Sequence, residues 1–271
     1  MPVKHPADPQ SDHPPHLSLS GVSKTFTLHL KGGIVLPVVH GVTFDVGPGE
    51  CVVLDGPSGA GKSSILKMIY GSYRADSGSI LVRTADDRKT GDRDKSHSAQ
   101  IDIVTADPRR ILALRASTLG YVSQFLRAIP RVSARDLVAA AVREGAAISR
   151  AETRDDDRGH EQAQELARAL LLRLNLPERL HDLPPATFSG GEQARVNIAR
   201  GFASRRPILL LDEPTASLDA SNRDVVEALI AERRNDGAAI VGIFHDREVR
   251  ERVATRLVDV TRFAAAATAA A

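Results

Sequence analysis

Residues 51–70 read CVVLDGPSGAGKSSILKMIY, and this stretch decides the class of fold. CVVLD predicts a buried strand, GPSGAGKS fits the phosphate-loop pattern GxxxxGK[ST], and SILKMIY predicts a helix. In a loop that joins a strand to a helix, glycine-rich backbone amides can wrap phosphates, and the helix N-terminus favours an anion. The stretch therefore predicts a nucleotide-binding α/β protein and leaves its reaction open.

The loop supplies two side chains with defined chemistry. Lys62 is expected to reach the β and γ oxygens of a bound nucleotide, and the Ser63 hydroxyl is expected to ligate Mg²⁺. A nucleotide and Mg²⁺ are therefore predicted to bind here. The predicted nucleotide-binding residues of this loop are Gly56, Pro57, Ser58, Gly59, Ala60, Gly61, Lys62, Ser63 and Ser64.

The composition indicates an ordinary globular protein. The chain has 271 residues, 42% of them hydrophobic and 26% charged, and its net charge is only +2. This length suffices for a packed core with a subdomain, and so small a charge excess does not favour a polyanionic partner. We therefore expect no nucleic acid among its partners.

The sequence predicts neither a membrane span nor a secretion signal. No run approaches the ~20 apolar residues of a span, and residues 1–16 carry prolines and charges where a signal peptide needs an apolar stretch. The single cysteine, Cys51, excludes an intramolecular disulfide, and its apolar context predicts a buried structural thiol. We expect a cytoplasmic protein without direct membrane insertion.

Two kinds of strand pattern alternate along the chain. Residues 17–19 and 42–46 alternate apolar with polar side chains, which predicts antiparallel strands with one wet face. Three other runs are apolar throughout and predict parallel strands buried on both faces, namely residues 51–54, 208–211 and 239–244.

Between these predicted strands, two segments have a side-chain pattern that is not typical of a strand. Residues 84–100 are polar and predict an exposed excursion, whereas residues 133–183 carry Ala, Leu, Arg and Glu at helical spacing. The predicted domains are a core formed by 17–124 and 203–263, with a helical subdomain at 125–202. A disordered tail is expected at 1–16 and a low-complexity tail at 264–271.

Polar residues mark the ends of the predicted buried strands. Asp212 and Glu213 follow the run ILLL, and His245 follows AAIVGIF. Ligands bind at the carboxyl ends of such strands. We therefore expect Asp212 and Ser63 to form a Mg²⁺ site, and we expect Glu213 to lie where it can polarise an attacking water. Gln124, after the strand at 119–123, fits the same site.

A second anion-binding helix start occurs in TFSGGEQARVNIARG, residues 187–201. Its free amides and helix dipole favour an anion, although a plain helix cap is the default interpretation of SGG alone. Ala194, Ile198 and Phe202 fall on one face and predict a buried side for this helix.

The ordered set of motifs resembles that of ABC ATPases. GPSGAGKS, Gln124, SGGEQ, LLLDEP, Ser217-Leu218-Asp219 and His245 are similar to their P-loop, Q-loop, signature, Walker B, D-loop and switch histidine. This resemblance covers residues 17 to about 263. It implies a P-loop NTPase (RecA-like) α/β core with an N-terminal antiparallel β subdomain and an inserted helical subdomain.

The resemblance also implies a head-to-tail dimer. Ser189 and Gly191 would act in trans on the nucleotide of the other chain, and Asp219 would lie along the dimer seam. The implied partner is an identical chain or a related ABC ATPase. The implied signature residues are Ser189, Gly190, Gly191, Glu192 and Gln193.

The same resemblance implies ATP and Mg²⁺ as cofactors, and it implies roles in hydrolysis. Glu213 would be the general base and His245 the switch, while Phe26 would stack on adenine. The implied metal-binding residues are Ser63, Gln124 and Asp212, and the implied catalytic set is Glu213, His245, Gln124 and Lys62.

Several longer stretches resemble one branch of this superfamily. They closely resemble the PhnL family, ABC-type subunits of the bacterial carbon–phosphorus lyase system for phosphonate breakdown, in GECVVLDGPSGAGKSSILKMIYGSY, GYVSQFLRAIPR, TFSGGEQARVNIARGF and GAAIVGIFHD. This resemblance implies an ATPase that acts on soluble lyase subunits and is grouped with ribose 1-methylphosphonate 5-triphosphate synthesis.

Two alternative functions stay open at this point. The chain has the general layout of membrane-transporter ATPases of the lipoprotein-release and macrolide-export type. A third hypothesis is an ATP-gated clamp in which hydrolysis only resets binding. Residues 124–131, QFLRAIPR, are expected on the partner-docking face, but their side chains suit a membrane or a soluble partner equally.

Overall fold

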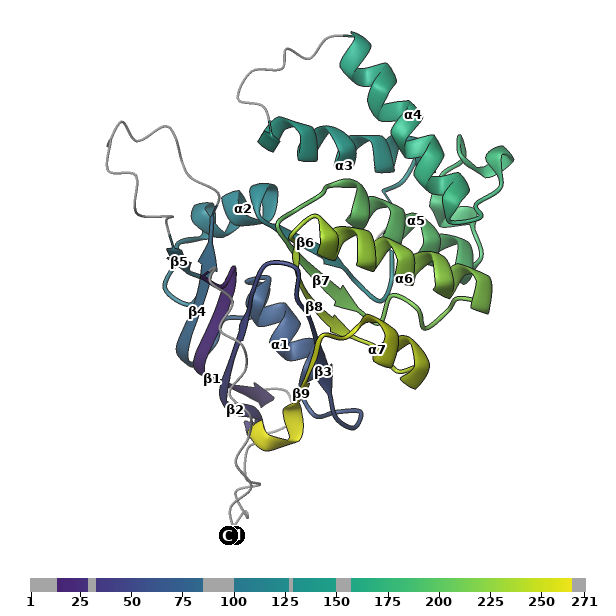
Figure 1. Ribbon diagram of the computed structural model, residues 1–271. Helices are drawn as coiled ribbons and strands as arrows, with labels where there is room; N and C mark the ends of the chain where they lie inside the picture. The colour runs from purple at the N-terminus through teal and green to yellow at the C-terminus, as the bar shows by residue number, and fades with distance from the viewer. Residues whose placement is uncertain (1–13, 29–32, 85–99, 127–128, 150–156, 265–271) are drawn as a thin grey trace, which may run out of the picture.

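The structure is a computed structural model that describes residues 14–28, 33–84, 100–126, 129–149 and 157–264. Its centre is a five-stranded parallel sheet in the order β6-β7-β8-β3-β9 (Figure 1). The strands are β3 (Cys51–Asp55), β6 (Leu119–Val122), β7 (Ile208–Asp212), β8 (Ala239–Ile243) and β9 (Arg256–Asp259). The predicted buried strands are confirmed, because β3, β7 and β8 lie side by side in this sheet.

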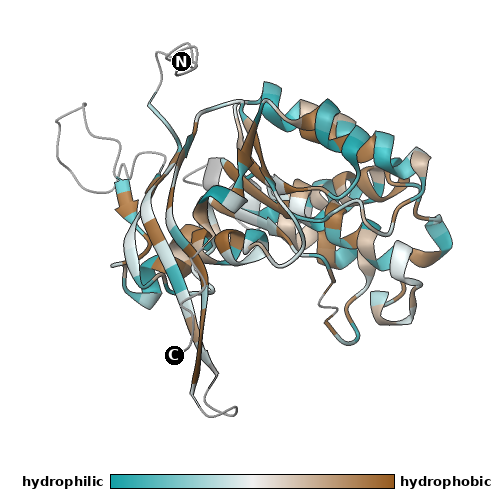
Figure 2. Cartoon of the chain, turned by 90° about the horizontal axis from the view of Figure 1, so that it is seen from below, coloured by the Kyte–Doolittle hydropathy of each residue, from teal (hydrophilic) through white to brown (hydrophobic). Residues whose placement is uncertain are grey.

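Both faces of the parallel sheet are buried, which explains the continuous apolar runs. Along β3, Val52 and Leu54 pack into a core that includes helix α1 (Lys62–Ile69) and an antiparallel sheet described below. Cys51 and Val53 pack into a second core, which is formed with helices that come later in the chain. In Figure 2 the central strands are largely brown, while the surrounding helices carry teal residues. Burial raises the pKa of the Cys51 thiol to about 12, as expected for a structural cysteine.

Helices surround the sheet. They are α1 (Lys62–Ile69), α2 (Pro108–Ser117), α3 (Ala134–Ser149), α4 (Asp157–Arg173), α5 (Gly190–Ala203), α6 (Ala220–Asn235) and α7 (Arg247–Val253). Within the segment predicted to be helical lie α3 and α4, which pack on each other beside α5 (Figure 1). Short 3₁₀ turns at Glu178–Leu180, Pro185–Thr187 and Val260–Phe263 complete the chain.

A four-stranded antiparallel sheet, in the order β2-β1-β4-β5, covers the other side of α1. Its strands are β1 (Leu17–Leu28), β2 (Ile34–Val46), β4 (Ser77–Arg83) and β5 (Gln100–Asp102). β1 and β2 extend well beyond the two short runs predicted from alternation. The alternation does not reveal their full length, because several register shifts between the two strands interrupt the period of two. The predicted excursion lies between β4 and β5, and residues 85–99 are outside the described residues.

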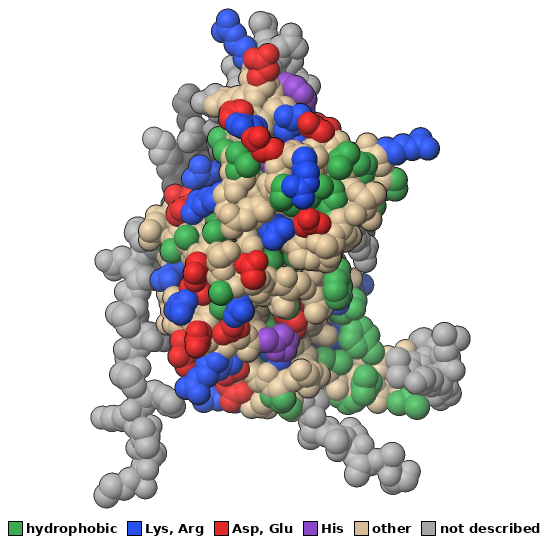
Figure 3. Space-filling view, turned by 90° about the vertical axis from the view of Figure 1, so that its right-hand side faces the viewer, with side chains coloured by type: hydrophobic (Ala, Val, Ile, Leu, Met, Phe, Trp, Pro, Cys, Tyr) green, Lys and Arg blue, Asp and Glu red, His purple; other side chains and the backbone are tan. Residues whose placement is uncertain are grey.

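The hydrophobic pattern of the sequence does not predict α2 and β9, and there is a physical reason for this. α2 buries only Leu114, and β9 buries only Val258, so neither displays an apolar stripe or run. Among the described residues, no helix is long and apolar enough to cross a bilayer. On the face that carries α6 and α7, positive and negative side chains are interspersed (Figure 3), as the small net charge leads one to expect.

Candidate nucleotide site

The phosphate loop connects β3 to α1 as predicted. Gly61 is the N-cap of α1 in the left-handed region, at φ 95°, and a Cβ there would lie 2.6 Å from Val39 Cγ1. Only glycine fits this combination of conformation and close approach. Lys62 Nζ donates to the backbone carbonyls of Gly56 and Pro57 at 2.6 and 2.8 Å, so its ammonium group lies across the loop.

Asp212, the last residue of β7, is held by two hydroxyl groups. Its side chain is only 6% exposed, which is costly for a carboxylate that lacks donors or a cation. Ser63 Oγ donates to Oδ1 at 3.0 Å, and Tyr121 Oη donates to Oδ2 at 2.7 Å. The structure thus brings together Ser63 and Asp212, which are 149 positions apart in the sequence.

Glu213 begins the turn after β7 with a strained backbone. Its φ is 54°, a value that non-glycine residues adopt rarely and mainly at functional sites. The backbone N–H of Glu213 donates to the carbonyl of Ile243 at 3.1 Å, which anchors the turn to the end of β8. This conformation places the Glu213 carboxylate among the polar groups that end β6 and β8.

The two oxygens of Glu213 have separate partners. Gln124 Nε2 donates to Oε2 at 3.1 Å, and His245 Nε2 lies 2.7 Å from Oε1. The His245 nitrogen must carry the proton here, since a carboxylate only accepts. Gln124 and His245, which lie just after β6 and β8, therefore both contact the carboxylate of Glu213, which lies just after β7. The side chain of Glu213 is 16% exposed, whereas that of His245 is 53% exposed.

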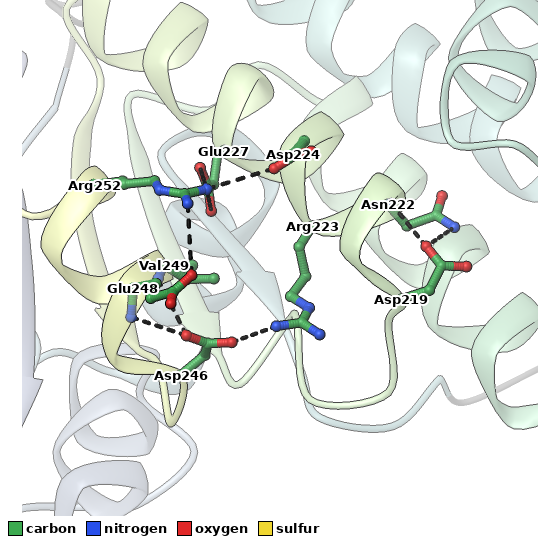
Figure 4. A network of polar contacts seen from close by, with 9 residues as sticks. All are labelled: Asp219, Asn222, Arg223, Asp224, Glu227, Asp246, Glu248, Val249 and Arg252. Atoms are coloured by element: carbon green, nitrogen blue, oxygen red, sulfur yellow. Dashed lines mark hydrogen bonds and ion pairs between the residues drawn. The ribbon is translucent and has the colours of Figure 1, made fainter.

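A polar network connects α6 to Asp246, the residue that follows His245 in the sequence (Figure 4). Asp246 caps α7 by accepting from the N–H groups of Glu248 and Val249, and its other oxygen pairs with Arg223 of α6. Asp219 caps α6 itself, accepting from Asn222 N and Nδ2 at 2.9 Å. The predicted D-loop residue Asp219 and the predicted switch histidine therefore lie on elements joined by Arg223. No motif in the sequence marks Arg223 as a functional residue.

We expect Arg223→Met to lower ATP turnover by about two- to fivefold, the effect of losing a partly exposed ion pair. ATP affinity should stay unchanged, because Arg223 does not touch the phosphate loop. Phosphate release and nucleotide titration measure the two effects. Arg252→Met is the matched control, since it removes an ion pair between α7 and α6 that does not include Asp246. Equal losses in both variants would contradict a specific role for Arg223.

The signature residues begin α5 through a reciprocal cap. Ser189 is the N-cap, and its backbone N–H and hydroxyl both donate to Glu192 Oε2 at 2.8 Å. These hydrogen bonds, the hydroxyl's first, lower the pKa of Glu192. Ser189 and Gly190 are exposed, and Gly191 lies against the backbone of Ser217 in the D-loop. Within the described residues, no hydrogen bond joins 189–193 to the phosphate loop of the same chain.

The predicted buried face of α5 is confirmed. Ile198 and Phe202 are buried, Ala194 packs against the same core, and Asn197 Nδ2 donates to the carbonyl of Ser123 at 2.6 Å. The last contact connects α5 to the segment that carries Gln124. The helix behind the signature is thus fastened to the Q-loop.

Phe26 lies on β1 with its ring edge against Tyr73, at a centroid distance of 5.2 Å. Lys24 Nζ lies 5.2 Å from the centre of the Phe26 ring. Its stacking on adenine stays a prediction.

A cavity of about 660 Å³ lies beside the Q-loop. Its wall contains Gln124, the aromatic Phe125, which is 74% exposed, and the cationic side chains of Arg115, Arg200 and Arg206. Arg206 is 4% exposed and pairs with Glu144 at 3.0 Å, whereas its buried Nη1 has no hydrogen-bond partner in the described part of the chain. Burial lowers the pKa of this guanidinium. The Nη1 nitrogen of Arg206 thus offers an unused donor to an acceptor group of another molecule, in a wall that also carries the carboxylates of Glu144 and Asp212.

The fold and these contacts define a P-loop nucleotide-binding protein with the predicted catalytic residues at the strand ends. The ABC transporter family model matches residues 39–216. The chain therefore belongs to the ABC transporter family, and it is an ATPase of this type that binds ATP.

Relatives with known names support this assignment. The chain is 36% identical over 236 residues to a lipoprotein-releasing system ATP-binding protein, LolD 2, of Caulobacter vibrioides, covering 87% of this chain and 90% of the relative. It is 32% identical over 247 residues to the macrolide export ATP-binding/permease protein MacB of Brucella melitensis, covering 91% of this chain. The chain spans about a third of that MacB protein, of which 33% is covered.

A solved structure shares the fold. The dimeric structure of MJ0796, a bacterial ABC transporter cassette, superimposes with a TM-score of 0.72 at 25% identity, covering 90% of this chain and 95% of that one. The same cassette is also known as a dimer in a post-hydrolysis state bound to ADP and Pi, with a TM-score of 0.71 to this chain. The predicted core with its antiparallel β subdomain is thereby confirmed.

Proposed function

We propose that this chain works as a head-to-tail dimer in which ATP hydrolysis drives a conformational change in a partner protein. The observation that carries the proposal is the Glu213 carboxylate, held between Gln124 and His245 next to the pair of Ser63 and Asp212. The exposed signature at Ser189 supports the dimer, because it is free to close over the nucleotide of a second chain. The dimeric MJ0796 structures support the same assembly.

The donor set fits a magnesium ion. The Ser63 hydroxyl and the Asp212 carboxylate are hard oxygen ligands, which Mg²⁺ prefers, and it commonly combines one or two carboxylates with substrate phosphates and water. When bound, Mg²⁺ would neutralise charge on the β and γ phosphates. Ser63 and Asp212 would hold it, and the Gln124 amide would serve the metal and the attacking water.

The remaining groups have complementary roles in this proposal. Glu213 accepts the proton of the attacking water, and His245 keeps the Glu213 carboxylate oriented through the 2.7 Å contact. Lys62 and the loop amides bind the phosphates, while Ser189 and Gly191 of the second chain supply donors from the opposite side. Phe26 stacks on adenine. Because both chains contact each nucleotide, ATP favours the closed dimer over the open one.

The cavity beside the Q-loop is the proposed docking site for the partner. Its exposed Phe125 offers an apolar contact, and the half-paired Arg206 offers a charge for an acidic side chain. The names of the LolD and MacB relatives support a membrane permease as that partner, with the ATPase at the cytoplasmic face. This transporter candidate is the one that the comparisons favour.

A second candidate partner is the soluble carbon–phosphorus lyase complex. It rests on the sequence stretches GYVSQFLRAIPR and TFSGGEQARVNIARGF, which resemble the ABC-type subunits of that system. Neither LolD nor MacB carries a name from phosphonate breakdown, so the lyase candidate has no support from these relatives.

Affinity purification of the full chain from cells growing on a phosphonate discriminates the two candidates. We expect a partner that is retained by the wild-type chain and lost by both Phe125→Asp and Arg206→Glu. Recovery of a permease supports the transporter candidate, and recovery of lyase subunits supports the other. Recovery of the same partner by all three chains would overturn docking at this cavity.

A further inference from the structure

Tyr121 is the one residue of β6 whose side chain reaches the carboxylate of Asp212 among the described contacts. Its hydroxyl donates to Oδ2 at 2.7 Å, while Oδ1 accepts from Ser63 at 3.0 Å. The two donors approach opposite oxygens of one group. The carboxylate is thereby fixed in rotation, with Oδ1 directed to the residue that follows Lys62 at the start of α1.

The Tyr121 ring is itself immobilised by its neighbours. Tyr70, the residue that caps the end of α1, stacks on it with a centroid distance of 5.0 Å and an interplanar angle of 27°. The Arg115 guanidinium lies 4.5 Å from the centre of the Tyr70 ring, and its Nε donates to the Tyr70 carbonyl at 2.9 Å. The phenol therefore stays in place without help from Asp212, as a positioning group must.

The hydroxyl distinguishes Tyr121 from a residue that serves packing alone. Its O–H donates to Oδ2 of the Asp212 carboxylate, which can only accept. A phenylalanine would preserve the stacking and would leave Oδ2 of a 6% exposed carboxylate without this donor.

We propose that Tyr121 is a positioning residue for the Mg²⁺ ligand Asp212, which it holds so that Oδ1 faces Ser63 and the phosphate loop. The proposal rests on the magnesium site of the proposed function. Hydrogen-bond partners that orient a metal ligand typically change metal affinity by about 10- to 100-fold when they are removed. Tyr121 belongs to this kind of group, because its hydroxyl contacts Asp212.

The test uses Tyr121→Phe with Tyr70→Phe as its matched control. The control removes a tyrosine hydroxyl from the same aromatic stack that does not bind Asp212, and it keeps the ring. The probe is a fluorescent N-methylanthraniloyl ATP, titrated with the full chain in EDTA and then at increasing Mg²⁺. This readout reports metal-dependent binding and needs no turnover.

For Tyr121→Phe we expect unchanged affinity in EDTA and a Mg²⁺ midpoint raised about tenfold or more. Excess Mg²⁺ should restore most of the turnover, and Tyr70→Phe should match the wild-type midpoint. An unshifted midpoint in Tyr121→Phe, or the same shift in both variants, would overturn the proposal. If the wild-type chain itself shows no Mg²⁺ dependence, the magnesium site of the proposed function fails instead.

Discussion

Replacing Glu213 by glutamine is expected to lower ATP turnover by about 100-fold or more while ATP stays bound, which is the typical effect of losing a general base. Glutamine keeps the size and can still hydrogen-bond Gln124 and His245, but its amide cannot accept the proton of the attacking water. Phosphate release gives the turnover, and nucleotide titration with Mg²⁺ gives the affinity.

Asp246→Asn is a suitable control for the Glu213 variant, because it changes a nearby carboxylate that caps α7 and pairs with Arg223. It should lose far less activity than Glu213→Gln. Undiminished turnover in Glu213→Gln would exclude Glu213 as the base and would leave His245 as the next candidate.

Ser189→Arg is expected to lower ATP hydrolysis by about 100-fold or more and to leave nucleotide binding to the single chain intact. Ser189 is exposed at the start of α5, so the arginine side chain need not be buried in its own chain. The loss of the N-cap costs about 1 kcal/mol of stability. The guanidinium would occupy the space where, in the proposed dimer, the signature meets the γ-phosphate, and the donors aimed at that phosphate would be lost.

Thr187→Arg is the matched control for Ser189→Arg, since it places the same side chain on an exposed residue two positions earlier. It should keep most of the activity. Equal loss of nucleotide binding and hydrolysis in Ser189→Arg would show that the signature serves its own chain's nucleotide, contrary to the trans arrangement.

The phosphate loop and the buried strands were predictable, because short sequence patterns specify them. The phosphate loop needs glycine at position 61 for steric reasons, and β3, β7 and β8 are apolar throughout because both faces are buried. The meeting of Gln124, Glu213 and His245 followed from the rule that parallel strands end at one edge. α2 and β9 escaped prediction because each buries a single residue.

The positioning residues could not be predicted from the sequence. Tyr121 sits within an otherwise apolar strand, where a tyrosine is as readily explained by packing, and only the structure shows its hydroxyl on Asp212. Arg223 is one of many charged residues on an amphipathic helix until its contact with Asp246 is seen. The partner could not be predicted either, because the side chains of residues 124–131 suit a membrane protein or a soluble partner equally.

In the proposed dimer each ATP is shared by two chains, and the mass of the Glu213→Gln chain in solution is the sharpest test of this arrangement. Light scattering with Mg²⁺ and ATP should give twice the mass of a single chain, falling to one chain when nucleotide is removed. The double variant Glu213→Gln with Ser189→Arg should remain a single chain although it binds ATP. A mass that does not depend on ATP, or a dimer that persists in the double variant, would contradict the account.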